Sequence, residues 1–138
     1  MQHRITAFVS TLILAACGSL SSYGAGLSAP EDQSKADIYT ARVKPIFAAN
    51  CGRCHSGMNH RGGLNMDTRE ALLKGGHTGP AIVPGDPTKS LLVIVIRHQR
   101  PGNDPKNMPP NKPQLSESDI HAVEMWIKAG APMPSPTR

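Results

Sequence analysis

A five-residue segment, Cys51-Gly52-Arg53-Cys54-His55, constrains this chain more than any other feature of its sequence. Two thiols stand three positions apart, and an imidazole follows the second one directly. On a helical turn, two such thiols share one face and can reach the two vinyl groups along one edge of a haem. The histidine then lies under the iron. The spacing therefore predicts one haem c, attached through Cys51 and Cys54, with His55 as an axial ligand.

Three other chemistries use cysteine and histidine at short spacing, and each fits this segment less well. A thioredoxin-like redox pair needs a βαβ context, and no strand-like segment precedes Cys51. A zinc finger needs a second ligand pair at close spacing, but His60 lies six residues after Cys54 and His77 lies seventeen after His60. A disulfide between Cys51 and Cys54 is compatible with an exported protein, but it gives His55 no role.

The second axial ligand of the iron has to come from the opposite side of the porphyrin. Met58 and His60 follow His55 too closely to cross the ring easily. Met108 stands in a proline-rich loop, Asn107-Met108-Pro109-Pro110, whose extended backbone can hold a thioether over the iron. A thioether also suits an electron carrier, because methionine–histidine ligation raises the reduction potential. We therefore predict that His55 and Met108 are the two protein ligands of the metal.

Alternatives to Met108 remain open from the sequence alone. His98, at the expected end of a helix, would give a haem with two histidine ligands and a lower potential. Met66 could also serve, or the position could stay open. Met125 falls opposite the apolar face of the last expected helix, so we expect it to be exposed.

The N-terminal residues have the pattern of an export signal. A short basic start precedes an apolar run from Ile5 to Ala16, which is too short to span a bilayer as a helix. The run ends in Leu14-Ala15-Ala16-Cys17, which resembles a bacterial lipobox and implies cleavage before Cys17 and lipidation of its sulfur. Ordinary cleavage near Ala25 or Ala29 is the alternative. The expected location is the periplasmic side of a bacterial membrane, lipid-anchored or otherwise soluble.

Changes in composition and the positions of glycine and proline divide the chain into four segments. We expect a lipoprotein-type signal peptide at 1–16, a Gly/Ser-rich flexible tether at 17–35, a monohaem domain at 36–133 and a disordered tail at 134–138. Aromatic residues make up 4% of the chain, so its core would be thin without a buried cofactor. The net charge of +5 favours acidic partner proteins or anionic head groups, or is simply solvated. The basic residues are scattered, which argues against nucleic-acid binding.

Periodicity predicts about four helices and no sheet. Apolar residues recur with helical spacing from Tyr39 to Asn50, where Pro45 kinks or restarts the helix. Further helices are expected at 68–74 and 88–97 and from Ser116 to about Gly130. The β-branched run in 90–97 could form a strand, but no second such run exists to pair with it. Phe47 and Trp126 are expected to pack the first helix against the last.

From Val43 to Ala131 the chain resembles the bacterial cytochrome c domains first catalogued in planctomycetes. The stretches that carry the resemblance are Val43-Lys44-Pro45-Ile46, Cys51 to His55, Gly62-Gly63-Leu64, Asp67-Thr68-Arg69-Glu70, Gly75-Gly76, Gly79 to Pro87, Ser90-Leu91-Leu92, Met108-Pro109-Pro110 and Trp126 to Ala131. The resemblance implies an all-α cytochrome c-like fold around one covalently bound haem, with His55 and Met108 as axial ligands. It also supports a helix at 88–97.

These observations predict a one-electron carrier rather than an enzyme, since no catalytic acid, base or nucleophile is needed. A haem-based ligand sensor, in which Met108 yields to a gas or peroxide, is one alternative. An electron-relay subunit of a membrane-bound redox complex, anchored through Cys17, is another. Arg53, Arg61 and Lys112 are candidates for contact with an acidic redox partner or with the haem propionates, although each could simply be solvated.

Overall fold

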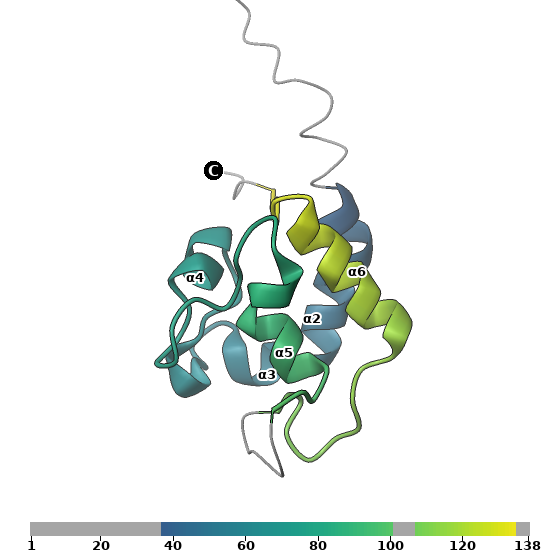
Figure 1. Ribbon diagram of the computed structural model, residues 1–138. Coiled ribbons are helices and arrows are strands. Elements are labelled where there is room, and N and C mark those ends of the chain that lie inside the picture. Colours follow the sequence, from purple (N-terminus) through teal and green to yellow (C-terminus); the bar gives the residue numbers. More distant parts are fainter. Residues whose placement is uncertain (1–36, 101–106, 135–138) are drawn as a thin grey trace, which may run out of the picture.

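The computed structural model describes residues 37–100 and 107–134, and within these ranges the chain is helical and contains no strand. The all-α prediction is therefore confirmed (Figure 1). The elements are η1 (Tyr39–Val43), α2 (Lys44–Asn50), α3 (Gly52–His55), η2 (Arg61–Gly63), α4 (Arg69–Lys74), η3 (Pro87–Lys89), α5 (Leu91–Ile96) and α6 (Glu117–Lys128). The sequence pattern does not predict α3, the single turn that carries the Cys-x-x-Cys-His segment.

The first helical segment changes its winding next to its proline. η1 is a π-helix, and α-helical geometry begins at Lys44 with Pro45 in the first turn of α2. Proline is well tolerated there, because the first amides of a helix have no intrahelical acceptor. The backbone stays helical through Val43 and Lys44, so the chain changes its winding next to Pro45 without a fresh start. The predicted apolar face is confirmed, since Tyr39, Val43 and Phe47 are buried.

An aromatic cluster joins this segment to α6, which lies beside α2 (Figure 1). The ring centroid of Trp126 lies 5.7 Å from that of Phe47 and 5.6 Å from that of Tyr39. The Trp126 side chain is fully buried, and its Nε1–H donates a hydrogen bond of 2.8 Å to the carbonyl of Pro132. The predicted contact between Phe47 and Trp126 is confirmed. Met125, one residue earlier on α6, is 46% exposed, also as predicted.

Capping side chains and glycines set the limits of α4. The Thr68 hydroxyl accepts a hydrogen bond from the Ala71 amide at the N-terminus. At the other end Gly75 has φ 71°, ψ −157°, a conformation essentially reserved for glycine. The predicted helix at 68–74 is thus confirmed within one residue. Beyond it, Gly76 and Gly79 pair across a tight turn, and the His77 amide donates to the Gly62 carbonyl.

The segment from Asp86 to Ile96 is helical, but it is not the single helix predicted for 88–97. Asp86 caps a 3₁₀ turn, η3, and α5 begins afresh at Leu91. Ser90 separates them and is fully buried, because its hydroxyl accepts from the Val83 amide and donates to the Asp86 carbonyl. These hydrogen bonds hold Ser90 in an extended conformation, and the extended residue separates η3 from α5.

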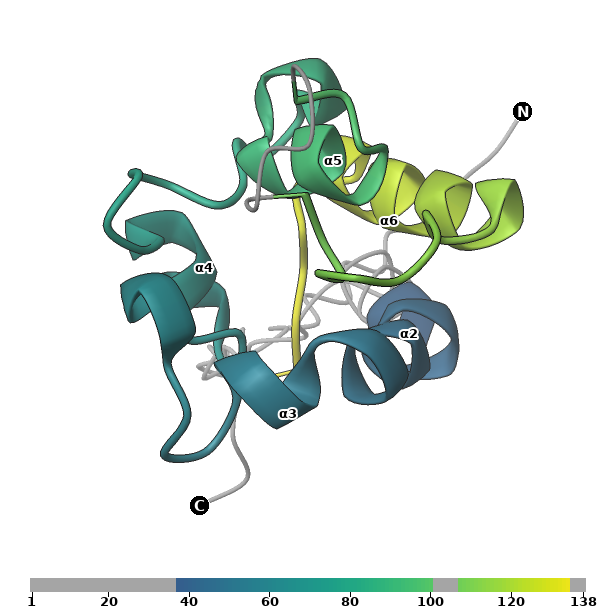
Figure 2. The ribbon, with the colours of Figure 1, turned by 90° about the horizontal axis from the view of Figure 1, so that it is seen from below.

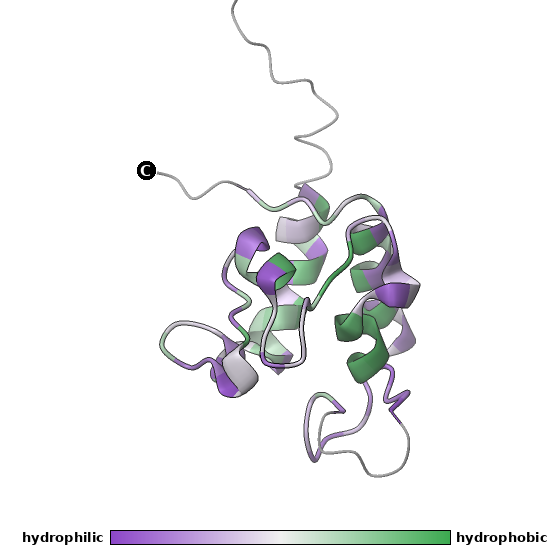
Figure 3. Cartoon of the chain, turned by 60° about the vertical axis from the view of Figure 1, so that its left-hand side comes forward, coloured by the Kyte–Doolittle hydropathy of each residue, from purple (hydrophilic) through white to green (hydrophobic). Residues whose placement is uncertain are grey.

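The last helix and its surroundings follow the prediction closely. Ser116 caps α6 through the Asp119 amide, and Gly130 follows its end with φ 95°. In Figure 3 the helices carry both hydrophobic and hydrophilic residues, whereas the loops are mostly hydrophilic or neutral. Among the described residues, none forms a helix of the length and hydrophobicity needed to cross a bilayer. The predicted signal peptide at 1–16, the tether at 17–35 and, apart from Pro134, the tail at 134–138 lie outside the described residues.

Candidate functional site

The turn α3 brings the three residues of the Cys-x-x-Cys-His segment together. Cys51 ends α2, where its amide donates to the Phe47 carbonyl, and its own carbonyl accepts from the amides of Cys54 and His55, each at 3.0 Å. The backbone therefore winds once between the two cysteines. The His55 carbonyl accepts from the Met66 amide at 2.8 Å, which fixes the end of the turn against the next segment.

A cavity of about 370 Å³ opens beside this turn. It is lined by Cys51, Cys54 and His55 and also by Met108, which is distant from them in the sequence. Figure 2 shows α2, α3, α4 and α5 arranged around a common centre. The lining residues of the cavity come from the end of α2, from α3 and α5, from the segments between α3 and α5, and from the chain that follows α5. The volume lies within the range of small-molecule and cofactor sites. The four residues predicted from the sequence thus border one space.

The lining has a distinct chemistry. Most of it is apolar and comes from Leu64, Met66, Ala81, Leu91, Leu92, Val95, Ile96, Pro109 and Pro110. The charged side chains among the lining residues are those of Arg61 and Arg100, with His77 beside them, and no carboxylate belongs to the described lining. Such a wall suits a large apolar group that carries negative charge at its edge.

Two buried nitrogens on lining residues have no hydrogen-bond partner within the described parts of the chain: His55 Nδ1 and Arg100 Nε. Buried polar atoms are nearly always paired, so each such atom calls for an explanation. Burial also lowers the pKa of His55, which favours the neutral imidazole that metals bind. The residues present therefore fit a haem, whose ring is apolar, whose iron takes an imidazole and whose propionates are anionic.

The two cysteines are free thiols, and both lie partly buried. Burial, with repulsion from Cys54, raises the pKa of Cys51 to about 11. Redox-active and zinc-binding cysteines instead work as thiolates with lowered pKa values. In the ranges that the structure describes, no group of three or more His, Cys, Asp or Glu side chains is placed to hold a metal ion. Cys51 is therefore unlike the attacking thiol of a disulfide oxidoreductase.

The structure separates the candidates for the second axial position. Met108 lines the cavity, and so does Met66, which is 4% exposed. His98 is not among the lining residues; its Nε2 lies 3.1 Å from the Met108 carbonyl oxygen. Met58 is 99% exposed, and His60 is exposed as well.

Among the residues of the cavity wall that sequence reasoning missed are two basic ones. Arg100 follows α5 and His77 stands in the glycine-rich turn after α4, and neither belongs to a recognisable pattern. Of the three basic residues predicted to lie near the haem edge, Arg61 lines the cavity, whereas Arg53 and Lys112 are exposed and do not. Only the folded path of the loops brings Arg100 and His77 to the site.

Comparison with known proteins agrees with the geometry of the cavity. Residues 51–112 match the family model described as Planctomycete cytochrome C, a span that contains the Cys-x-x-Cys-His segment, Arg61, Arg100 and Met108. No curated protein and no solved structure matches the chain. Residues 51–112 are thus similar to cytochrome c domains of the planctomycete type.

Proposed function

We propose that this chain is an exported monohaem c-type cytochrome that transfers single electrons, with haem c attached through Cys51 and Cys54 and its iron bound by His55 and Met108. The observation that carries the proposal is the cavity itself. Two thiols, an imidazole and a thioether border one apolar space, although Met108 is distant from the other three in sequence. The family match supports haem-based electron transfer as the general activity.

Haem c, when bound, supplies an iron that accepts and releases one electron. The chain would hold it and set its surroundings. Cys51 and Cys54 would fix it covalently, and the apolar lining would exclude water from the iron. Arg61 and Arg100 would offset the negative charge of the propionates, which explains why charged lining residues are cationic.

The carrier is favoured over a haem-based sensor by the way Met108 is held. Its amide donates to the Val95 carbonyl at 2.9 Å, and its carbonyl contacts the His98 imidazole. A methionine whose backbone amide and carbonyl are both hydrogen-bonded is poorly suited to leave the iron when a gas molecule competes for it. The cytochrome c domain likewise suggests a carrier rather than an enzyme.

Optical spectra of the oxidised and reduced protein, matured with the cytochrome c machinery, test the ligand set. We expect covalent haem, a low-spin spectrum and the methionine-to-iron charge-transfer band of the oxidised protein. Met108→Ala should abolish that band, and Met58→Ala, which removes a fully exposed thioether, should leave it intact. A band that survives in Met108→Ala would move the assignment to Met66, and a protein without covalent haem would overturn the proposal.

The proposed export and anchoring depend on residues outside those described. Cleavage before Cys17 and lipidation of its sulfur would anchor the domain on the periplasmic side of a bacterial membrane through the tether. Mass spectrometry of the mature protein tests this, because a diacylglyceryl group on Cys17 should disappear in Cys17→Ser. A mature N-terminus near Ala25 or Ala29 would show ordinary signal cleavage instead.

The proposed partner is a redox protein with an acidic docking surface, chosen because the chain carries a net charge of +5. Reduction by the anionic complex ferrocyanide should slow as salt is added, since salt screens the attraction. Reduction by the cationic hexaammineruthenium(II) should change in the opposite direction. Equal salt dependence with both reagents would rule out electrostatic steering.

A further inference from the structure

We propose that His98 is a positioning residue for Met108: its imidazole holds the Met108 carbonyl and so fixes the loop that carries the thioether. The inference rests on the proposed function, because it assigns a role at the same site. It also removes His98 from the list of axial ligands. The sequence alone leaves that alternative open.

The backbone of Met108 is held on both sides by the C-terminal turn of α5. The Met108 amide donates to the Val95 carbonyl at 2.9 Å. The Met108 carbonyl lies 3.1 Å from His98 Nε2. Two hydrogen bonds at one residue fix the position and orientation of its backbone, from which the thioether extends.

The hydrogen bond decides which form of the His98 imidazole is present. A carbonyl oxygen only accepts, so Nε2 must carry the hydrogen. Nε2 therefore has no lone pair for a metal, and only Nδ1 of His98 could act as a ligand. His98 is also absent from the cavity lining, to which Met108 belongs. The two residues are thus neighbours with different roles rather than rivals for one position.

The backbone of His98 supports a specific role for its side chain. It has φ 50°, in the left-handed region that glycine and asparagine adopt more readily. Its amide donates to Val95 and the Gln99 amide donates to Ile94, which closes the end of α5. At this φ a histidine lowers the stability of the fold relative to glycine. The contact of its imidazole with Met108 explains why a histidine stands there.

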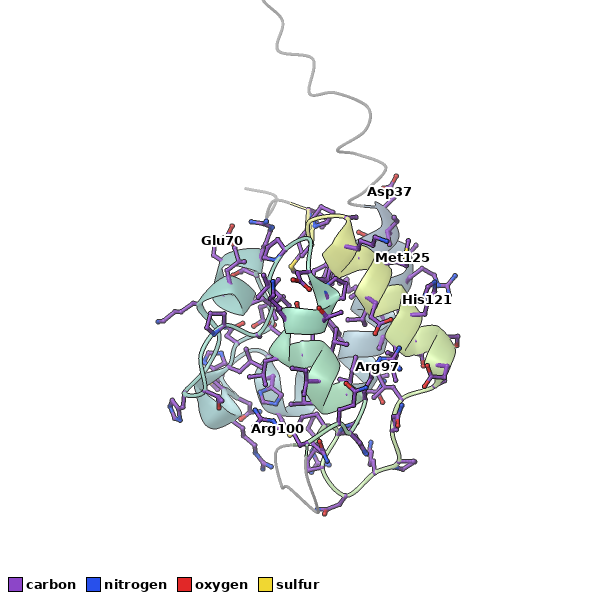
Figure 4. All side chains as sticks on the ribbon, viewed as in Figure 1. Asp37, Glu70, Arg97, Arg100, His121 and Met125 are labelled. Atoms are coloured by element: carbon purple, nitrogen blue, oxygen red, sulfur yellow. The ribbon has the colours of Figure 1, made fainter. Side chains whose placement is uncertain are left out.

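The turn that holds Met108 is itself fixed to α6. The Arg97 Nε donates to Glu124 at 2.7 Å and its Nη1 to Glu117 at 3.3 Å. Figure 4 shows Arg97 between the end of α5 and α6. A continuous set of contacts therefore runs from α6 through Arg97 and His98 to Met108. These contacts tie the turn that holds Met108 to α6.

Two substitutions at His98 distinguish the effect of the imidazole from the effect of the backbone conformation. His98→Gly keeps the left-handed turn and removes the hydrogen-bond donor, whereas His98→Asn keeps the turn and supplies an amide donor. The readout is the affinity of the oxidised protein for added imidazole, which must displace Met108 to bind iron. We expect His98→Gly to bind imidazole about tenfold more tightly, as loss of one hydrogen bond predicts.

The matched controls are His98→Asn and His121→Asn, the second on the exposed face of α6 (Figure 4). Both should stay within about threefold of the wild type. Wild-type affinity in His98→Gly overturns the inference and leaves the proposed function standing. A low-spin wild-type spectrum that lacks the methionine-to-iron band and becomes high-spin in His98→Gly makes His98 the axial ligand and also overturns the inference. A wild type without covalent haem overturns the proposed function, and the inference with it.

Discussion

The domain has two sides that are stabilised in different ways. The helical side consists of η1, α2 and α6, and the glycine side consists of residues 57–85. On the helical side the interior is close-packed, with Val43, Val123 and Trp126 fully buried. On the glycine side, six glycines of the described chain have positive φ, namely Gly57, Gly62, Gly63, Gly75, Gly79 and Gly85. The helical side depends on side-chain burial, whereas the glycine side, which also buries Leu72 and Ile82, depends in addition on the conformation of its backbone.

The difference explains how a chain with few aromatic residues encloses a cavity. Three of its five aromatic side chains meet in one cluster on the helical side. The glycine side has to curve around the cavity with short segments, and their amides bond to carbonyls of the same side, as His77 does to Gly62 and Ala81 to Leu72. The two sides should therefore respond to different substitutions.

Trp126→Ala should have the largest effect, because it removes the centre of the helical side. We expect the free energy of unfolding to fall by about 3–5 kcal/mol, the usual cost of truncating a buried aromatic residue. Denaturant unfolding of the haem-loaded protein measures it. Met125→Ala, one residue away but exposed, should change stability by less than about 0.5 kcal/mol. Melting of Trp126→Ala at the wild-type temperature would contradict the packing of α6 on α2.

Gly75→Ala should be the most damaging change on the glycine side. A Cβ at Gly75 would lie 1.8 Å from the Gly79 carbonyl oxygen, a backbone atom, and its φ of 71° with ψ −157° suits only glycine. We expect a loss of about 2–4 kcal/mol, measured by thermal and denaturant unfolding.

Gly57→Ala is the matched control, because Gly57 has a similar φ of 62° and no atom within 4 Å of its would-be Cβ. It should cost only about 1 kcal/mol, for the left-handed conformation alone. Equal losses in the two variants would show that conformation matters and close contact does not. That result would weaken the claim that the glycine side depends on tight backbone approach.

The sequence predicts the helical side better than the glycine side, for a physical reason. The buried face from Tyr39 to Phe47, the cap Ser116, and the contact of Phe47 with Trp126 follow from spacing within a helix. The Cys-x-x-Cys-His segment is equally local. Patterns within one or two turns are visible in a sequence, because the helix period fixes which residues share a face.

Features that depend on distant segments could not be predicted. Ser90 splits the expected helix at 88–97 because it satisfies the turn at Val83 and Asp86, which no local pattern indicates. Arg100 and His77 reach the cavity only through the path of their loops. The role of His98 was open for the same reason, since its partner is ten residues away.

Arg69→Gln tests the connection between the two sides. From α4, the Arg69 Nε donates to the Ala131 carbonyl at 3.0 Å and its Nη2 donates to the Gly130 carbonyl at 3.1 Å. These carbonyls follow the end of α6, where a cation is also favoured by the helix dipole. We expect a loss of about 1.5–3 kcal/mol in denaturant unfolding, as for hydrogen bonds from a charged group. Arg42→Gln, at an exposed arginine of η1, should have little effect, and equal losses would show that only net charge matters.

Asp86→Asn should have the smallest effect and should be visible only as a pH dependence. Hydrogen bonds from Thr88 and Lys89 lower the pKa of Asp86 to about 2. The folded state therefore favours the carboxylate, and this contribution is complete above the unfolded pKa of about 4 and is lost as pH falls through about 2. Between pH 5 and pH 2, the unfolding midpoint of the wild type should fall more than that of Asp86→Asn.

Thr88→Val, which removes the hydroxyl that donates to Asp86 at 2.6 Å, should give an intermediate slope. Parallel curves for all three proteins would show that ionisation of Asp86 does not contribute to the stability of the fold.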